Sequence, residues 1–429
     1  SDSKVCRFFS SVTKEQMIGF LDDWNKRRDH KQRIYISYDS SNKNCNAGDI
    51  DLIEYGKAKD NKGIPIFNLA IAFDKTNRVP LFYEEYPGSI TDVSQFVHMV
   101  DKVTEYGYKK VGFILDRGYF SKDNIRYMEE GGYAFVIMVK GRKALVSSLV
   151  EENRGTFETE RDHSIRAYHV YGKTVKARLY EDDTQDRYFH IYFNPSKHAA
   201  ERERLELTLD RFKIYMDKHI GDVVTSSKAC QEYFTLKYDK AGHLVGYSER
   251  KDVIKRELDL CGYFCIVTSE EMTASQALIH YKGRDVSEKL FSTDKSFIGS
   301  KSMRVQTTQA LSAKIFVEFI ALIVRNRMYN LLKETMLRLE TKPNYMTVPA
   351  ALRELEKIEM VRRGNGHYRL DHAVTKKQKT ILSAFGLSDT DVKSIAIEIG
   401  SQLSGNQTPT DKAPEEDDDY GEDTFTIID

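Results

Sequence analysis

Three strand-like segments that follow one another without a helical segment between them constrain the fold of this chain most. They cover residues 33–39, 66–73 and 80–86, with turn-forming residues at Gly63-Ile64-Pro65 and Asp74-Lys75-Thr76-Asn77. Short runs of β-branched and aromatic residues bounded by Gly, Pro and Asn are typical of strands joined by turns. The sequence therefore predicts an antiparallel meander.

Helical and apolar segments alternate after the meander. Helical periodicity covers residues 92–106 and 121–130, and short apolar runs cover residues 111–115 and 133–139. A strand that returns to the same sheet through a helix runs parallel to its predecessor. We therefore predict an α/β protein with a mixed five-stranded sheet in the layout of the ribonuclease H fold, although the pattern alone also fits other mixed α/β sheets.

The rest of the sequence predicts a division into six regions. A stretch of alternating polar and apolar residues interrupts the core, and a long apolar helix over residues 306–332 marks the return to it. The predicted regions are a lead-in helix within 1–30, the first part of the core over 31–140, a β-rich insertion over 141–275, the second part of the core over 276–335, a C-terminal helical region over 336–400 and a disordered acidic tail over 401–429.

The net charge of zero conceals an acidic C-terminus. Residues 411–429 hold nine acidic groups and one lysine, which leaves a charge of +8 on the rest of the chain. A mildly basic body suits a polyanionic partner such as DNA, but many domains without such a partner carry a similar charge.

The five cysteines predict neither a disulfide framework nor a zinc site, because their number is odd and no CxxC pair occurs. We interpret Cys261 and Cys265 as buried thiols and the compartment as a reducing cytoplasm. We expect no membrane partner, because no run of about 18 apolar residues occurs. The start at Ser1, without a methionine, indicates the edge of a fragment or of a processed chain.

Two aspartates stand where predicted strands end. Asp39 closes the first strand, and Asp116 follows the apolar run at residues 111–115. In a ribonuclease H order these two strands are neighbours, so both carboxylates would lie at one edge of the sheet and could bind a hard divalent cation. An aspartate at a strand end is also a common turn or cap residue, which leaves a structural role open for each.

One predicted helix, around residues 283–295, presents a carboxylate flanked by two cations and a phenol. Tyr281, Arg284, Glu288 and Lys295 have offsets of 0, 3, 7 and 14, which place them within about 60° of one another on a helix. Glu288 is a candidate third metal ligand, and Arg284 and Lys295 are candidate phosphate contacts. A solvated helix face with an i,i+4 pair between Arg284 and Glu288 explains the same spacing.

Tyr281-x2-Arg284-x3-Glu288-x6-Lys295 resembles the YREK signature of DDE transposases from bacterial insertion sequences, the insertion-sequence-four superfamily. Three further segments are similar to motifs of that family, and the resemblance runs from about residue 30 to 335 and more weakly to about 390. The three segments are Tyr38-Asp39-Ser40 (first aspartate), Asp116-Arg117-Gly118-Tyr119 (second aspartate) and Pro87-Gly88-Ser89-Ile90-Thr91-Asp92, which has serine where the family's P-G-N-x-x-D turn has asparagine.

The resemblance implies an enzyme of DNA transposition and recombination that cleaves and transfers strands at insertion-sequence ends. It implies that Asp39, Asp116 and Glu288 form the catalytic and metal-binding triad with two Mg²⁺ or Mn²⁺ ions, and that the region between the second aspartate and the glutamate carries a β-strand insertion. It also implies a homodimer on DNA, phosphate contacts from the other residues of the signature, and a bacterial cytoplasmic location at the nucleoid. Such enzymes usually carry an N-terminal DNA-binding domain, which this sequence does not show.

Basic residues near the predicted site are candidates for further DNA contacts, although short basic loops are also common solvated surface. The candidates are Lys57, Lys59 and Arg117. The rival carboxylates, which lack a strand-end position, are Asp49, Asp51 and Glu54. Two other functions stay open, namely a ribonuclease H-like nuclease without strand transfer and an inactive transposase-derived DNA-binding protein.

Overall fold

The structure is a computed structural model in which the chain forms two compact units, Ser1–Ile323 and Val324–Asp429. It describes residues 2–45, 50–56, 63–140, 143–224, 227–284, 302–339, 343–364 and 366–405. The limits of the six predicted regions stay predictions.

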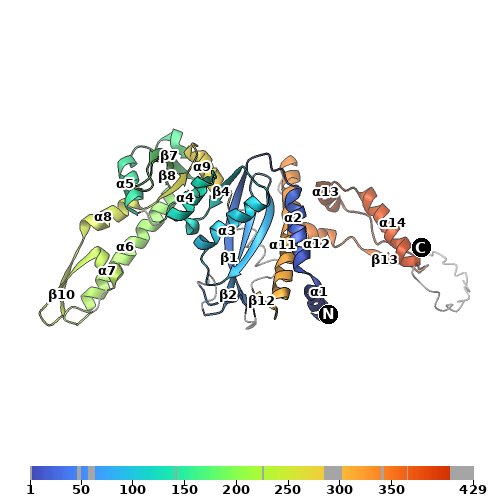
Figure 1. The fold of residues 1–429 in the computed structure, drawn as a ribbon, viewed down its shortest axis with the longest axis horizontal. Coiled ribbons are helices and arrows are strands. Elements are labelled where there is room, and N and C mark those ends of the chain that lie inside the picture. Colours follow the sequence, from blue (N-terminus) through green and yellow to red (C-terminus); the bar gives the residue numbers. More distant parts are fainter. Residues whose placement is uncertain are drawn as a thin grey trace, which may run out of the picture. The chain divides into compact units, whose positions relative to one another are not determined.

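The predicted meander is confirmed. Its strands pair antiparallel in the order of the sequence (Figure 1). They are β1 (Ile34–Cys45), β2 (Ile66–Asp74) and β3 (Val79–Pro87). Every residue of β2 is buried, because this central strand of the meander is covered on both faces.

The first strand is longer than predicted, so the position assigned to Asp39 was wrong. β1 continues through the polar residues 40–44 to Cys45, and Asp39 lies opposite Ile71 inside the strand. The prediction ended the strand at Asp39, but polar side chains beyond it have partners in the core. Lys43, for example, is fully buried and forms an ion pair with Glu318 at 2.9 Å.

The predicted alternation of helices and strands is also confirmed. β1 and β4 run parallel, as do β4 and β5, and all five residues of β4 are buried. The elements are α3 (Asp92–Glu105), β4 (Val111–Leu115), the short 3-10 helix η1 (Arg117–Tyr119), α4 (Lys122–Glu130) and β5 (Ala134–Met138). Capping explains where the helices begin, since the hydroxyls of Thr91 and Ser121 accept from the backbone of α3 and α4.

Within the described residues the sheet has ten strands, whereas the sequence predicted five. Its order is β3-β2-β1-β4-β5-β11-β8-β7-β6, and β12 pairs with β1 outside this path. The strands predicted as an insertion therefore continue the same sheet, because β11 pairs antiparallel with β5. The elements of this region are α5 (Lys143–Asn153), η2 (Arg161–His163), β6 (Ser164–Ile165), η3 (Arg166–Tyr168), β7 (Val170–Ala177), β8 (Arg187–Phe193), α6 (Pro195–Lys218), α7 (Lys228–Tyr233), β9 (Phe234–Tyr238), β10 (Leu244–Glu249), α8 (Lys251–Leu260) and β11 (Tyr263–Thr268).

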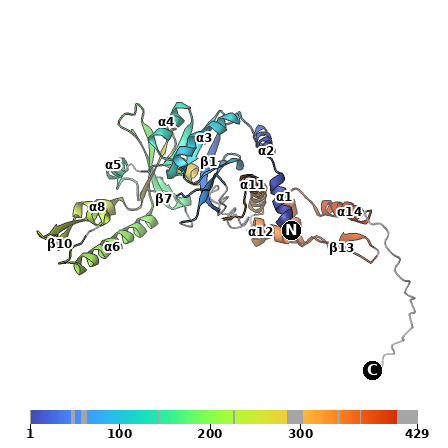
Figure 2. The same ribbon diagram turned by 60° about the horizontal axis from the view of Figure 1, so that its bottom comes forward.

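This region also holds helices, of which α6 is the longest at 24 residues. α6, α7 and α8 pack with the β9–β10 hairpin around a small core of their own (Figure 2). The buried residues of that core are Leu209, Met216, Cys230, Phe234, Leu244 and Ile254. "β-rich" thus describes the strands β6 to β8 and β11, but not the helical segment between β8 and β11.

Helices at both ends of the first unit complete its core. α2 and α11 pack against the meander through Phe20 and Phe316, whose rings lie 5.3 Å apart. α9 covers β4 and β5. These elements are α1 (Asp2–Ser11), α2 (Lys14–Lys26), α9 (Ala274–Lys282), β12 (Ser302–Met303) and α11 (Thr308–Arg338). In the part of the chain that the structure describes, no helix is both long and apolar enough to cross a membrane.

The second unit has its own core around Leu332, Ala351 and Ile381. Its elements are η4 (Asn344–Met346), α12 (Val348–Leu355), β13 (Met360–Arg362), β14 (Tyr368–Leu370), α13 (Lys376–Ala384) and α14 (Asp389–Gly405). α13 ends near Gly386, whose φ of +73° favours glycine, and α14 begins a few residues later. α14 extends to Gly405, and residues 406–429, which make up most of the predicted tail, lie outside the described residues.

Candidate active site

The end of β4 brings Asp39 and Asp116 together. The last pair of residues between the parallel strands β1 and β4 is Tyr38 and Leu115. Asp39 and Asp116 follow directly, so the two residues are neighbours at the point where the pairing of β1 with β4 ends. Their side chains are 15% and 35% exposed, which leaves this carboxylate pair reachable from solvent. The predicted pairing of these two carboxylates therefore agrees with the topology, although Asp39 lies within its strand.

Arg284 lies between the two carboxylates. Its Nη1 is 3.8 Å from Asp39 Oδ2, and its Nη2 is 3.7 Å from Asp116 Oδ1. The side chain is only 12% exposed. The sequence suggested a phosphate contact for this arginine, whereas the structure shows its guanidinium facing both acids.

Tyr281 supports the same arrangement from the last turn of α9. The side chain is buried, and its hydroxyl donates to Asp116 Oδ1 at 3.3 Å. The guanidinium of Arg284 lies 5.4 Å from the ring centroid of Tyr281, within the range of a cation–π contact. Tyr281 therefore orients Asp116, and its contact with DNA stays a prediction.

The helix that carries Tyr281 lies just before the helix that the sequence predicted around residues 283–295. α9 ends at Lys282, and the amide of Arg284 donates to the carbonyl of Tyr281 at 3.1 Å in a tighter turn. Arg284 therefore follows the helix end, where we expected the start of a helix at Gly283. The other two residues of the predicted face, Glu288 and Lys295, lie outside the described residues.

A hydrogen-bonded carboxylate on the other face of β1 supports Asp39. Asp92, in the first turn of α3, accepts from the Ser40 hydroxyl at 2.7 Å and the Tyr86 hydroxyl at 2.8 Å. Ser40 in turn donates its amide to Asp39 Oδ1 at 3.0 Å. Burial raises the pKa of Tyr86, and the nearby Asp92 adds to this effect. Both phenol and serine therefore stay protonated donors, and Asp92 holds the backbone beside Asp39.

Sequence reasoning assigned no role to Asp92. The signal was present, because Asp92 is the last residue of the Pro87–Asp92 motif. The motif turns the chain from β3 into α3 and so delivers the carboxylate to Ser40. A β-carbon on Gly118 would lie 3.9 Å from Asp92 Oδ2 and 4.0 Å from Asp116 Oδ2, so both acids face this glycine.

The other predicted site residues lie apart from this centre or outside the described residues. Arg117 is exposed on η1, directly after Asp116, where a phosphate could reach it. Glu54 accepts from the amide of Ser89 at 3.3 Å, and Asp51 is exposed. Lys57, Lys59 and Asp49 lie outside the described residues. Within the described ranges, no three His, Cys, Asp or Glu side chains are grouped so that they could hold a metal ion.

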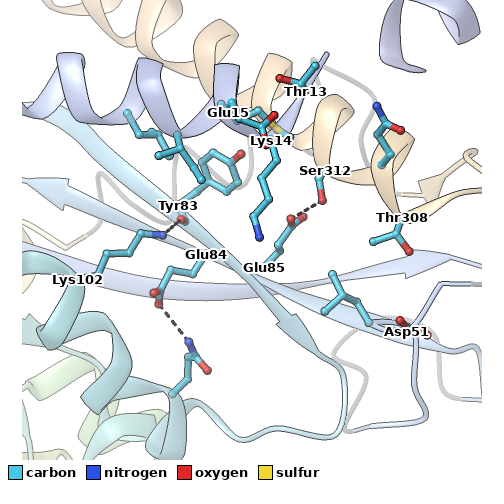
Figure 3. Close-up of a pocket in the computed structure, with 16 residues that line it drawn as sticks. Thr13, Lys14, Glu15, Asp51, Tyr83, Glu84, Glu85, Lys102, Thr308 and Ser312 are labelled. Carbon is cyan, nitrogen blue, oxygen red and sulfur yellow. Dashed lines mark hydrogen bonds between the residues drawn. The ribbon is translucent and has the colours of Figure 1, made fainter. Parts of the chain in front are cut away.

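A cavity of about 830 Å³ lies elsewhere, between α2, β3 and the start of α11 (Figure 3). Its polar groups bind one another. Ser312 donates to Glu85 Oε1 at 2.5 Å, and Lys102 donates to the carbonyl of Tyr83 at 3.2 Å. Burial raises the pKa of Glu85 and lowers the pKa of Lys102. Neither Asp39 nor Asp116 lines this cavity, so we assign it no part in the site.

Comparison with known proteins places the carboxylate pair in a family context. Residues 39–324 match the family model of the transposase DDE domain. No curated protein matches the sequence. The match begins at Asp39 and includes Asp116, Tyr281 and Arg284.

Solved structures show only weak likeness to this chain. The piggyBac transposase synaptic complex with hairpin DNA has 8% identity and a TM-score of 0.40, covering 96% of this chain and 64% of that one. The Mos1 transposase paired-end complex with left transposon end has 12% identity and a TM-score of 0.18, covering 29% and 43%. The Drosophila P element transposase strand transfer complex has 13% identity and a TM-score of 0.18, covering 94% and 75%. None is similar enough to assign a role to a residue here, and the chain spans less than two thirds of the piggyBac transposase.

Proposed function

Because this chain belongs to the family of transposase DDE domains, we propose that it cleaves DNA at the ends of a mobile element and joins those ends to target DNA. The observation that carries the proposal is the pair of carboxylates of Asp39 and Asp116. Each residue directly follows the last paired residue of its strand in the parallel pair β1–β4. Both are reached by one cationic group, the guanidinium of Arg284.

The donor set of this pair fits a divalent cation. Mg²⁺ and Mn²⁺ prefer carboxylate oxygens and keep positions open for water and phosphate. The guanidinium of Arg284 lies within 4 Å of both carboxylates, which supports a shared cation. Asp39 and Asp116 would hold the ions, with Glu288 as the proposed third ligand. When bound, two such ions supply Lewis acidity at the phosphodiester and lower the pKa of an attacking hydroxyl.

The residues around the pair would orient ligands and substrate. Tyr281 fixes one oxygen of Asp116 by its hydrogen bond, and the Ser40 amide fixes one oxygen of Asp39. Arg284 balances the two negative charges in the free protein and can turn its fork toward a phosphate when ions take its place. Arg117, exposed beside Asp116, can bind the neighbouring phosphate.

The reaction itself would run in two displacements at phosphorus. Water attacks a phosphodiester at the element end, and the broken bond releases a 3′-hydroxyl. That hydroxyl then attacks a target phosphodiester, and the target's own 3′-oxygen leaves with a proton. In the first step a P–O bond to the water oxygen replaces an ester bond, and in the second step one P–O ester bond replaces another. Neither step needs a covalent enzyme intermediate.

The finer assignments belong to the same proposal. The chain would be a YREK-group member of the insertion-sequence-four superfamily with a ribonuclease H-like core. The contacts of Tyr281 and Arg284, the first two residues of that signature, with the aspartates support this assignment. It would act as a homodimer on DNA in the bacterial cytoplasm, at the nucleoid. Lys57, Lys59, Lys295 and Arg117 would bind DNA phosphates.

A cleavage assay tests the proposal. Purified protein, Mg²⁺ and an oligonucleotide with the terminal repeat that flanks the gene are mixed, and nicked and joined products are separated by length. We expect nicking and joining that Asp39→Asn and Asp116→Asn abolish. Asp51→Asn serves as the matched control, because Asp51 is exposed and lies outside the site.

The products distinguish the alternatives. Nicking without joining, even with excess target DNA, would indicate a nuclease without strand transfer. DNA binding without any cleavage in Mg²⁺ or Mn²⁺ would indicate an inactive DNA-binding protein. Cleavage by both Asp39→Asn and Asp116→Asn would show that the carboxylate pair is not the active site.

A further inference from the structure

A lysine outside all the motifs caps the helix that carries Tyr281. Lys75 lies between β2 and β3, and its Nζ donates to the carbonyl oxygens of Ile279 and His280, each at 3.1 Å. Both carbonyls belong to the last turn of α9. The negative end of a helix dipole favours a cation there, and the lysine satisfies carbonyls at the end of the helical ladder.

Lys75 is fixed to the same strand as Asp39. Its amide donates to the carbonyl of Tyr35 on β1 at 2.9 Å, four residues before Asp39. The ring of Tyr35 lies 4.7 Å from the ring of His280. The lysine therefore joins the end of α9 to β1 through both its backbone and its side chain.

Gly283 provides the space for the lysine stem. A β-carbon at position 283 would lie 2.0 Å from Lys75 Cε, closer than any real contact allows. The stem thus passes directly over the residue that precedes Arg284. A larger residue at 283 would expel the lysine or move the chain.

The cap coincides with the turn that directs Arg284 to the site. The amide of Arg284 donates to Tyr281, three residues back, so the carbonyl of His280 accepts from the amide of Gly283 at 3.2 Å and not from its usual α-helical partner four residues on. Lys75 takes a place at this carbonyl. Arg284 then leaves the helix axis and lies between the two acids.

We propose that Lys75 is a positioning residue for the proposed reaction, because it holds the end of α9 where Tyr281 and Arg284 meet Asp116 and Asp39. This inference rests on the proposed function, and one of its tests is independent of activity.

The charge of Lys75 gives the cap a dependence on pH. Burial lowers the pKa of Lys75 to about 8, so the cap loses its charge as the pH rises above that value. His280 Nδ1 lies 3.5 Å from the amine. Other titratable groups on the elements around the amine include Tyr35 on β1, Asp74 at the end of β2, Tyr281 and Lys282 on α9, Arg284 after α9, and Glu270 with its ion-pair partner Arg33.

Hydrogen–deuterium exchange of residues 277–284 tests the position of the helix end without a substrate. We expect Lys75→Met, which keeps the stem and removes the charge, to speed exchange there about tenfold and to leave β4 unchanged. Lys109→Met is the control, because Lys109 is exposed on a loop of the same unit. Gly283→Ala should have the same local effect, since its β-carbon displaces the stem.

Single-turnover cleavage tests the effect on the reaction. We expect Lys75→Met to lower the cleavage rate about 10- to 100-fold and to leave the Kd for DNA unchanged. Above pH 8 the difference in rate between the wild type and Lys75→Met should become smaller, because the wild-type lysine then loses its charge. Lys75→Arg, which keeps a donor and a charge, should recover part of the rate.

The two readouts separate failure of this inference from failure of the proposed function. Wild-type protein that does not cleave overturns the proposed function, and exchange at residues 277–284 still decides whether Lys75 holds the helix end. Exchange equal to that of Lys109→Met, or a rise that extends through β4, overturns a positioning role. A cleavage rate within twofold of the control overturns it as well.

Discussion

The buried ion pair between β1 and α11 offers a quantitative test of how the strand of Asp39 is held. Lys43 Nζ lies 2.9 Å from Glu318 Oε2, and the two side chains are 0% and 7% exposed. Glu318→Gln removes the negative charge and leaves a buried ammonium. Loss of one partner of a buried pair costs about 3–5 kcal/mol, whereas replacing both partners with apolar residues is often neutral.

Urea unfolding of the first unit measures this cost. The chain has a single tryptophan, Trp24, whose indole donates to the carbonyl of Pro80 at 2.9 Å, so its fluorescence follows that unit. We expect Glu318→Gln to lower the free energy of unfolding by about 3–5 kcal/mol. The double variant Lys43→Met/Glu318→Leu should recover most of the loss.

An exposed pair provides the control. Lys213 and Glu249 form an ion pair with side chains 39% and 30% exposed, so Glu249→Gln should cost about 1 kcal/mol or less. A loss at Glu318→Gln no larger than at Glu249→Gln would refute the reasoning. So would a double variant less stable than Glu318→Gln, because the packing of the pair and not its charge would then support β1.

Three further predictions concern the site and the sheet. Thermal unfolding with and without Mg²⁺ measures how much the ion raises Tm. This rise should be larger for Arg284→Gln than for the wild type, because the two acids lose a competing cation, and a rise no larger than in the wild type would contradict this. Ser40→Ala should slow cleavage about tenfold through loss of a charged hydrogen bond to Asp92, worth about 1.5 kcal/mol, and an unchanged single-turnover rate would show that Asp92 does not support Asp39. Burial lowers the pKa of His190, whose ring lies between two threonine hydroxyls, to about 4. As the pH falls, the unfolded chain therefore protonates this histidine before the folded chain does. The free energy of unfolding should fall by up to about 3 kcal/mol between pH 6.5 and 4. His190→Gln should flatten that part of the urea-derived stability profile, and an equally steep profile would count against the buried neutral imidazole.

Local signals in the sequence predict the parts of the site that depend on local structure. The apolar run before Asp116 is a buried strand, and the capping residues Thr91 and Ser121 begin the helices on either side of it. Crossover topology then places this strand beside β1. For these reasons the pairing of Asp39 with Asp116 could be predicted from the sequence.

Contacts between distant residues determine what the sequence could not show. β1 extends beyond Asp39 because Lys43 finds its partner Glu318 on α11, far along the chain. The sheet grows from five to ten strands because β11 pairs with β5. The place of Arg284 depends on Lys75, which no motif includes. Neither periodicity nor spacing within a segment carries such information.

The central claim is that the carboxylate pair binds the ions of a DNA-cleaving centre. The most direct test of this claim is the metal specificity of Asp116→Cys. A thiolate is a softer ligand than a carboxylate and binds Mn²⁺ better than Mg²⁺. We predict that Asp116→Cys cleaves element-end DNA with Mn²⁺ but not with Mg²⁺, whereas the wild type uses both. Full cleavage by Asp116→Cys with Mg²⁺ would contradict the account, because Asp116 could then not be a ligand of the catalytic ions.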